Sequence, residues 1–128
     1  MISHEKLEVY QLALKCVERS FALVETGPRG YAELSSQLRR AIVSVALNIA
    51  EGAGKSAFAD KRNYYLVARG SAMESAAVCD ILYNARLIEG TQHRECKNLL
   101  EQIVAMLSRM CMNLEDKIGT RGKGKGQG

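Results

Sequence analysis

The segment Ala41–Ala50, AIVSVALNIA, decides how the rest of the chain must fold. Eight of its ten residues are apolar, and the two polar ones, Ser44 and Asn48, lie four apart and share one helix face. A helix that is apolar nearly all round is buried on more than one side. The run is about half the length that a membrane span requires. The segment therefore predicts a central core helix, and one that also meets a second subunit.

Apolar residues recur at helical spacing on both sides of this segment. The four predicted helices cover about residues 5–25, 31–53, 57–88 and 92–117. Ser56 is the expected N-cap of the third helix and Thr91 that of the fourth. Four amphipathic helices joined by short connections predict an all-α fold, an antiparallel up-down-up-down four-helix bundle over residues 1–118.

The charge of the chain is concentrated near its end. The 128 residues carry 18 Lys/Arg and 14 Asp/Glu, a net charge of +4. The last ten residues, GTRGKGKGQG, hold three of these cations and no acid, and are predicted to be a disordered basic tail, 119–128. This tail fits a short nucleic-acid-binding arm and a solubilising or expression-derived tail equally well. A nucleic-acid surface on the bundle itself must come from clustered charge.

Several classes of function find no motif in this sequence. The polar start MISHEKLEVY predicts neither a signal peptide nor a membrane span, so a cytoplasmic protein is expected. The four cysteines form no C-x-x-C pair and are interpreted as buried free thiols. His4 and His93 are isolated, and no nucleotide-binding or nucleophile motif occurs. We therefore expect no metal, no cofactor and no enzyme activity.

Two stretches of the second and third predicted helices resemble the signatures of a known family. They are SQLRRAIVS at 36–44 with NIAEG at 48–52, and ARGSA at 68–72 followed by Glu74. These stretches resemble the bacterial four-helix-bundle family named for proteins encoded in 23S rRNA intervening sequences, and LEVYQLA at 7–13 is similar to the family's start. Members commonly have Pro in place of Ala46 and Trp in place of Tyr10.

The resemblance covers about residues 7–118 and implies more than a fold. It implies a homopentameric ring of bundles and an association with nucleic acid. The accessory proteins of diversity-generating retroelements, which assist a reverse transcriptase and its RNA, are distant relatives of the same fold.

A basic helix face is the main candidate for nucleic-acid binding. Arg62, Tyr65 and Arg69 lie at i, i+3 and i+7 and share one face of the third helix. We predict that this face holds phosphates and that Tyr65 stacks a base. The candidate nucleic-acid-binding residues are Arg39, Arg40, Lys55, Lys61, Arg62, Tyr65 and Arg69. In the alternative interpretation these charges solvate the surface, and Arg69 pairs with Glu51 or Glu74.

A polar stripe crosses the most apolar helix, with Arg40, Ser44, Asn48 and Glu51 at helical spacing. Such a stripe fits the lining of a pore or of a small-molecule site. The favoured interpretation is a buried polar network or subunit interface formed by Ser44, Asn48 and Glu51, since buried polar groups require partners.

These patterns lead to one expected function and one alternative. The expected function is a non-catalytic, oligomeric helical module that associates with RNA through its basic face. The alternative is a protein-interaction scaffold with no nucleic-acid role. The expected partners are further copies of the chain, RNA, and an unidentified protein.

Overall fold

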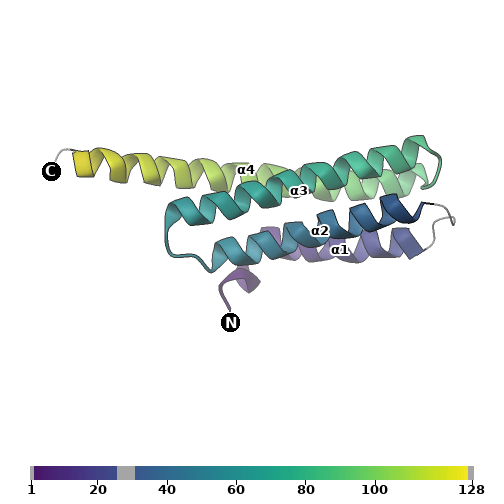
Figure 1. The fold of residues 1–128 in the computed structure, drawn as a ribbon, viewed down its shortest axis with the longest axis horizontal. Coiled ribbons are helices and arrows are strands. Elements are labelled where there is room, and N and C mark those ends of the chain that lie inside the picture. The colour runs from purple at the N-terminus through teal and green to yellow at the C-terminus, as the bar shows by residue number, and fades with distance from the viewer. Residues whose placement is uncertain (1, 26–30, 127–128) are drawn as a thin grey trace.

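The computed structural model describes residues 2–25 and 31–126, and this part of the chain contains four α-helices and no strand. The helices are α1 (Glu8–Glu25), α2 (Ala32–Ala53), α3 (Phe58–Asn84) and α4 (Gly90–Gly126), and α1 follows a 3-10 turn, η1 (Ser3–Lys6). Consecutive helices run antiparallel in Figure 1, and α1 and α3 each pack on both α2 and α4. The predicted four-helix bundle is confirmed. None of the described helices is long and apolar enough to cross a membrane.

The predicted central segment lies at the centre of the core. Ile42, Val45 and Ile49 of α2 are completely buried. They belong to one hydrophobic cluster to which all four α-helices contribute. Leu47, on the opposite face of α2, is 61% exposed. Within one chain, therefore, the segment is buried over a broad face but not all round.

A left-handed residue ends α3 four residues earlier than the sequence predicts. Arg86 has φ of 62°, and it is the single described residue other than glycine with a positive φ. Its N–H donates to the carbonyl oxygen of Tyr83 (3.0 Å), and the N–H of Leu87 donates to that of Leu82 (2.9 Å). These two bonds form a Schellman motif, which closes a helix. Glycine usually occupies the left-handed position that ends a helix. Because this chain has Arg86 there, the sequence does not indicate that α3 ends at this point.

The first turns of α3 and α4 also differ from the predicted caps. Ala57, not Ser56, occupies the N-cap position of α3, and no side chain hydrogen-bonds there. At the start of α4, the side chain of Gln92 accepts a hydrogen bond from the N–H of Glu89 (2.9 Å). The predicted cap, Thr91, lies inside α4. A glutamine reaching back in this way satisfies an N–H that has no partner within the helix.

Substituting Arg86 with glycine is expected to raise the free energy of unfolding by about 1 kcal/mol. A residue with a Cβ loses roughly 1–2 kcal/mol in the left-handed conformation, whereas glycine adopts it readily. Urea denaturation measures the change. Arg94→Gly, the same substitution within α4, is the control and should lower stability by about 1 kcal/mol. A loss of stability in both variants would contradict the left-handed turn.

The last helix is longer than predicted. The sequence predicts its end near Lys117, but α4 continues to Gly126 as one helix of 37 residues. Glycine disfavours a helix without forbidding it, and no proline follows. Once a helix is formed, each added residue gains one backbone hydrogen bond. Figure 1 shows the end of α4 projecting beyond the α2–α3 turn. Of the predicted tail, residues 127 and 128 lie outside the described part.

Candidate nucleic-acid interface

Tyr65 lies in the core and not on the surface. It is 5% exposed, and burial raises the pKa of its hydroxyl. An added Cβ on Gly52 of α2 would lie 2.6 Å from the ring atom Cε1, so the ring packs directly on α2. Tyr65 continues the buried stripe of α3 that includes Ala68 and Ala72. The prediction that Tyr65 stacks a base is wrong, because its ring faces the other helices.

Arg62 and Arg69 lie together along the edge between α3 and α4, and both are half-buried. Arg69 Nη1 donates to Ser108 Oγ of α4 (3.4 Å), and the Arg62 carbonyl oxygen accepts from Cys111 Sγ (4.0 Å). Burial raises the pKa of the Cys111 thiol, and the charges of Arg69 and Arg62 oppose that rise. The Nε atom of Arg62 is buried without a hydrogen-bond partner. The two guanidinium groups therefore both lie near the part of α4 that contains Ser108 and Cys111.

The ion pairs proposed for Arg69 in the alternative interpretation do not form. Among the described residues, no ion pair joins Arg69 to Glu51 or Glu74. Glu51 instead lies 4.0 Å from the ammonium of Lys55, and Glu74 accepts a hydrogen bond from Gln37 (3.3 Å). The charge of Arg69 is thus not neutralised by either acid.

The two lysines of the α2–α3 turn have different environments. Lys61 Nζ donates to the carbonyl oxygens of Ala53 (2.9 Å) and Gly52 (3.3 Å). It thus places a positive charge at the end of α2, where the helix dipole is negative. Lys55 Nζ lies 5.3 Å from the ring centroid of Tyr64, at cation–π distance. The ammonium group of Lys61 is therefore hydrogen-bonded to the end of α2, while that of Lys55 lies beside the ring of Tyr64.

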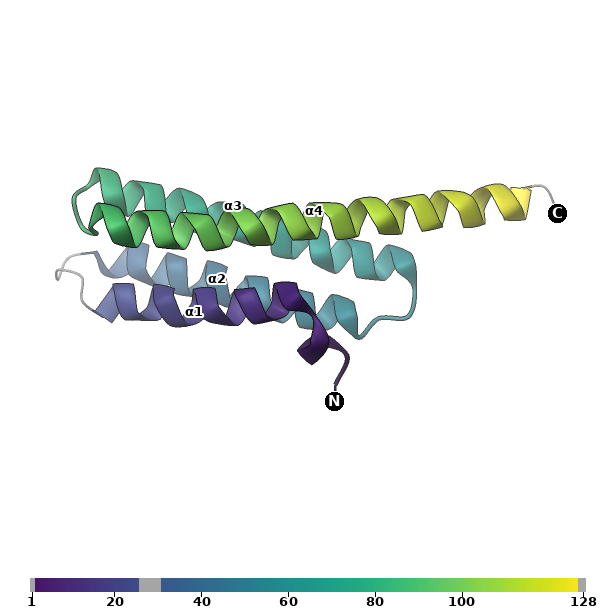
Figure 2. The ribbon, with the colours of Figure 1, turned by 180° about the vertical axis from the view of Figure 1, so that it is seen from behind.

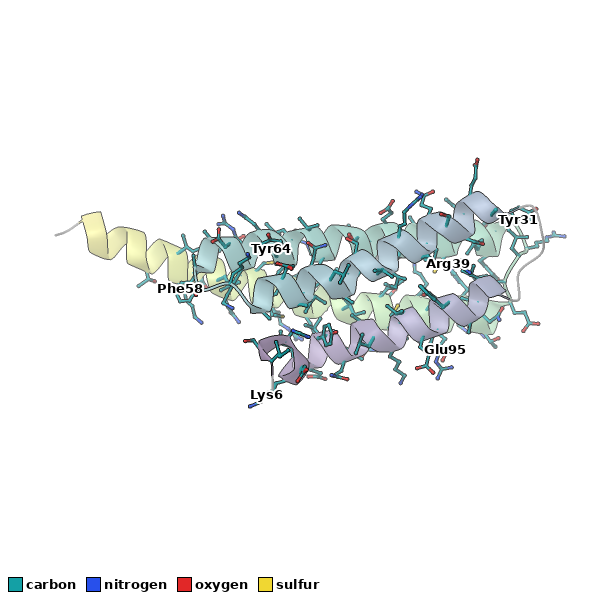
Figure 3. All side chains as sticks on the ribbon, turned by 60° about the horizontal axis from the view of Figure 1, so that its bottom comes forward. Lys6, Tyr31, Arg39, Phe58, Tyr64 and Glu95 are labelled. Carbon is teal, nitrogen blue, oxygen red and sulfur yellow. The ribbon has the colours of Figure 1, made fainter. Side chains whose placement is uncertain are left out.

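Tyr64 is the aromatic residue that sequence reasoning missed. It is half-buried, so part of its ring meets solvent next to Lys55. Figure 3 shows Tyr64 near Phe58 at the end of the bundle where α3 begins. Adjacent helical residues point about 100° apart, so only one of two neighbouring tyrosines can join the core stripe. The spacing of Tyr65 with Ala68 and Ala72 is the sequence signal that could have placed Tyr65, and not Tyr64, in the core.

Arg39 and Arg40 lie apart from this group. In Figure 3, Arg39 is on the part of α2 toward Tyr31, far from Tyr64. Its guanidinium carbon lies 5.6 Å from the ring centroid of Phe21 on α1. Arg40 lines a shallow pocket of about 240 Å³ between α2 and α3. The seven predicted residues therefore do not form one continuous face.

The polar stripe of α2 forms a hydrogen-bonded seam with α3. Ser44 Oγ lies 2.8 Å from Ser71 Oγ. The amide of Asn48 donates to both the carbonyl oxygen (2.8 Å) and the hydroxyl (3.0 Å) of Ser44. Ser75 Oγ, completely buried, donates to the Ser71 carbonyl oxygen (2.8 Å). Glu51 does not belong to this seam, because its side chain is exposed and lies toward Lys55.

Positive charge gathers in the half of the bundle that contains the α2–α3 turn. The described segments of this half, residues 2–16, 43–71 and 103–126, carry eleven Lys/Arg and six Asp/Glu, and three of these cations, Arg121, Lys123 and Lys125, belong to the projecting end of α4. The rest of the sequence carries seven Lys/Arg and eight Asp/Glu. Lys117, near the projecting part of α4, lies 5.3 Å from the ring centroid of Phe58. From Lys117 onward the sequence contains no acid. Among the described residues, the excess of positive charge thus lies at the end of the bundle with the α2–α3 turn and along the projecting part of α4.

The opposite half contains the closest ion pairs among the described residues. Asp80 lies 2.7 Å from His93 Nε2 and 3.0 Å from Lys97 Nζ, across the α3–α4 hairpin. The His93 hydrogen bond is the main cause that lowers the pKa of Asp80, and Lys97 adds to it. Arg19 of α1 pairs with Glu95 of α4 at 2.8 Å. Acids and cations are therefore matched at this end.

Comparisons with known proteins agree with the fold. Residues 5–109 match the profile of a family described as the 23S rRNA-intervening sequence protein. A crystal structure from Bacteroides thetaiotaomicron, described as a protein of unknown function from the S23 ribosomal protein family, is similar with a TM-score of 0.75. The two chains are 23% identical, over 80% of this chain and 97% of the other, so the likeness concerns the fold alone. None of the curated proteins compared with the chain matches it.

Proposed function

The chain belongs to the 23S rRNA-intervening sequence protein family, and we propose that it is a non-catalytic, oligomeric module that associates with RNA. The observation that carries this proposal is the excess of cations in the half of the bundle that contains the α2–α3 turn. Phosphate contacts dominate the affinity of proteins for nucleic acids, and clustered Lys and Arg side chains supply them.

The proposed contact surface follows the edge between α3 and α4. Arg62 and Arg69 present guanidinium groups there that no described acid neutralises. Lys117 lies further along the same edge, over Phe58. Tyr64 lies beside Lys55 on the side of α3 that meets α2, and it takes the stacking role first expected of Tyr65 where the RNA continues from this edge around the α2–α3 turn. In a cyclic oligomer, symmetry would repeat this surface around the axis.

The double variant Arg62→Ala/Arg69→Ala is expected to weaken RNA binding. Loss of two phosphate contacts should reduce the slope of log affinity against log salt by about 1.5–2. The measurement is a salt titration with labelled structured RNA, on nuclease-treated protein whose mass is checked by light scattering. Arg39→Ala/Arg40→Ala, which removes equal charge from the opposite half, is the control and should change the slope less. Equal slopes in the wild type and in a folded Arg62/Arg69 variant would refute the proposed surface.

A protein-interaction scaffold is the second candidate, favoured by exposed apolar side chains on the outer face of α3. Met73 and Ile81 are 58% and 50% exposed. Met73 also borders an apolar groove of about 420 Å³ between α3 and α4. An apolar docking surface binds with little dependence on salt, whereas phosphate binding weakens steeply as salt rises. Absence of RNA binding at low salt, in a protein of oligomeric mass, would favour the scaffold.

A further inference from the structure

The shallow pocket between α2 and α3 has no part in the proposed RNA surface. Its volume is about 240 Å³, and its lining residues are Gln37, Arg40, Ala41 and Ser44 of α2 with Ser71 and Glu74 of α3. Ala41 is buried and the two serines are half-buried, so these three residues form the floor. The exposed side chains of the other three residues form the rim. Polar groups therefore line both the floor and the rim.

The two hydroxyl groups of the floor carry one proton more than the protein accepts. Ser44 Oγ and Ser71 Oγ lie 2.8 Å apart, and whichever of them donates, this contact uses one hydroxyl proton. The amide of Asn48 supplies a donor to Ser44 Oγ (3.0 Å) and no acceptor. Among the described residues, no further acceptor is bound to either hydroxyl. One O–H group is therefore left to donate to whatever occupies the pocket.

The rim carries one positive and one negative group that the protein leaves available. In the part of the chain that the structure describes, the guanidinium of Arg40 has no ion-pair or hydrogen-bond partner. Glu74 Oε1 accepts a hydrogen bond from Gln37 Nε2 (3.3 Å), which leaves the other carboxylate oxygen, Oε2, open. The charges of the pocket sum to zero, so a ligand with a net charge is repelled by one of the two groups. A neutral zwitterion is attracted by both.

The two charged groups lie about one helical turn apart along the seam. The hydrogen bond between Gln37 and Glu74 places Glu74 level with Gln37, and Arg40 follows three residues further along α2. At about 1.5 Å per residue, this separation is roughly 5 Å. Ser71 lies three residues before Glu74 on the antiparallel helix, so its hydroxyl is level with Arg40. The pocket therefore has a donor end, with Arg40 and the available O–H group, and an acceptor end at Glu74.

We propose that this pocket binds a free α-amino acid, with the carboxylate of the ligand at Arg40 and its ammonium at Glu74. A guanidinium binds a carboxylate through two parallel N–H donors, and the available O–H group adds a third. A phosphate or a nucleotide would bring negative charge toward Glu74 without an ammonium to offset it. The pocket is smaller than the roughly 300–1,000 Å³ of sites for drug-sized ligands, which favours a small side chain. The pocket opens between α2 and α3, away from the α3–α4 edge, so it is independent of the proposed RNA surface.

The test is isothermal titration calorimetry of the full chain with three matched probes at millimolar concentration. L-Alanine carries both charged groups, N-acetyl-L-alanine carries only the carboxylate, and L-alaninamide carries only the ammonium. We expect L-alanine to bind, and each derivative to bind at least about tenfold more weakly, because it leaves one charged group of the pocket unpaired. Absence of L-alanine binding, or equal affinities for the three probes, would overturn the proposal.

Two variants of the rim test the orientation of the ligand. Glu74→Gln should abolish the preference for L-alanine over N-acetyl-L-alanine, whereas Arg40→Gln should abolish the preference for L-alanine over L-alaninamide. Both side chains are exposed, so the variants should keep the wild-type urea midpoint. Glu33→Gln and Arg94→Gln remove exposed charges outside the pocket and are the controls, which should bind L-alanine as the wild type does. Wild-type preferences in both rim variants would refute the assigned site.

Discussion

Replacing Tyr65 with alanine is expected to lower the free energy of unfolding by about 3–5 kcal/mol, the range found for buried aromatic residues. The ring is 5% exposed, belongs to the central hydrophobic cluster, and packs on Gly52 of α2. Its removal leaves a cavity between helices that α3 cannot close, since Ala68 and Ala72 on the same stripe are already small. A loss of this size is a large part of the 5–15 kcal/mol typical of a domain.

Tyr64→Ala is the matched control, because it deletes the same ring one residue earlier on the same helix. Tyr64 is only half-buried, so urea denaturation should show a clearly smaller loss of stability. RNA binding should respond in the opposite order: Tyr64→Ala weakens it, whereas a conservative Tyr65→Phe leaves it unchanged. A Tyr65→Ala variant with wild-type urea midpoint and impaired RNA binding would restore Tyr65 as a contact residue and contradict its burial.

Gly52→Ala is expected to destabilise the chain by about 1–3 kcal/mol, although alanine is the better helix former. The added Cβ would lie 2.6 Å from Tyr65 Cε1, 2.9 Å from Tyr65 Cδ1 and 3.1 Å from Tyr64 Cβ. Two of these contacts are closer than carbon atoms normally approach, so α2 and α3 must move apart. The gain of roughly 1 kcal/mol in helix propensity offsets only part of that strain.

Gly70→Ala is the control for this substitution. Gly70 lies within α3, is exposed, and has no atom within 4 Å of an added Cβ. Urea denaturation should therefore show a gain of up to about 1 kcal/mol there. Combining Gly52→Ala with Tyr65→Leu should cost less than the sum of the two single changes, because the clashing ring atoms are gone. Strictly additive losses would show that the two residues do not touch.

The fold could be predicted because helical periodicity is a local property of the sequence. The starts of α1, α2 and α3 and the buried face of Ala41–Ala50 follow from apolar spacing. The end of α3 does not, because Arg86 adopts a conformation that is expected of glycine. The end of α4 does not either, because glycines that disfavour a helix still continue it to Gly126.

The candidate site was harder to predict, because periodicity shows which residues share a face but not what that face meets. Arg62, Tyr65 and Arg69 do share a face of α3. That face points toward α2 and α4, so the ring is buried while the longer guanidinium groups reach the edge. Glu51 continues the spacing of Ser44 and Asn48, but the stripe reaches solvent before Glu51. These outcomes depend on how helices pack, which one sequence does not specify.

Because α4 is one continuous helix, the length of the molecule and the extent of its hydrophobic core are set by different parts of the same element. At about 1.5 Å per residue, its 37 residues span roughly 55 Å, and the last turns extend past every other element (Figure 2). From Asn113 to Thr120, the last residue of α4 whose burial the structure describes, only Leu114 belongs to the hydrophobic cluster. Fraying of the tip would therefore shorten the reach of the chain without opening the part of the core that Leu114 closes. A force applied to an intact tip, by contrast, would reach the core directly, because the tip and the buried part of α4 belong to one continuous helix.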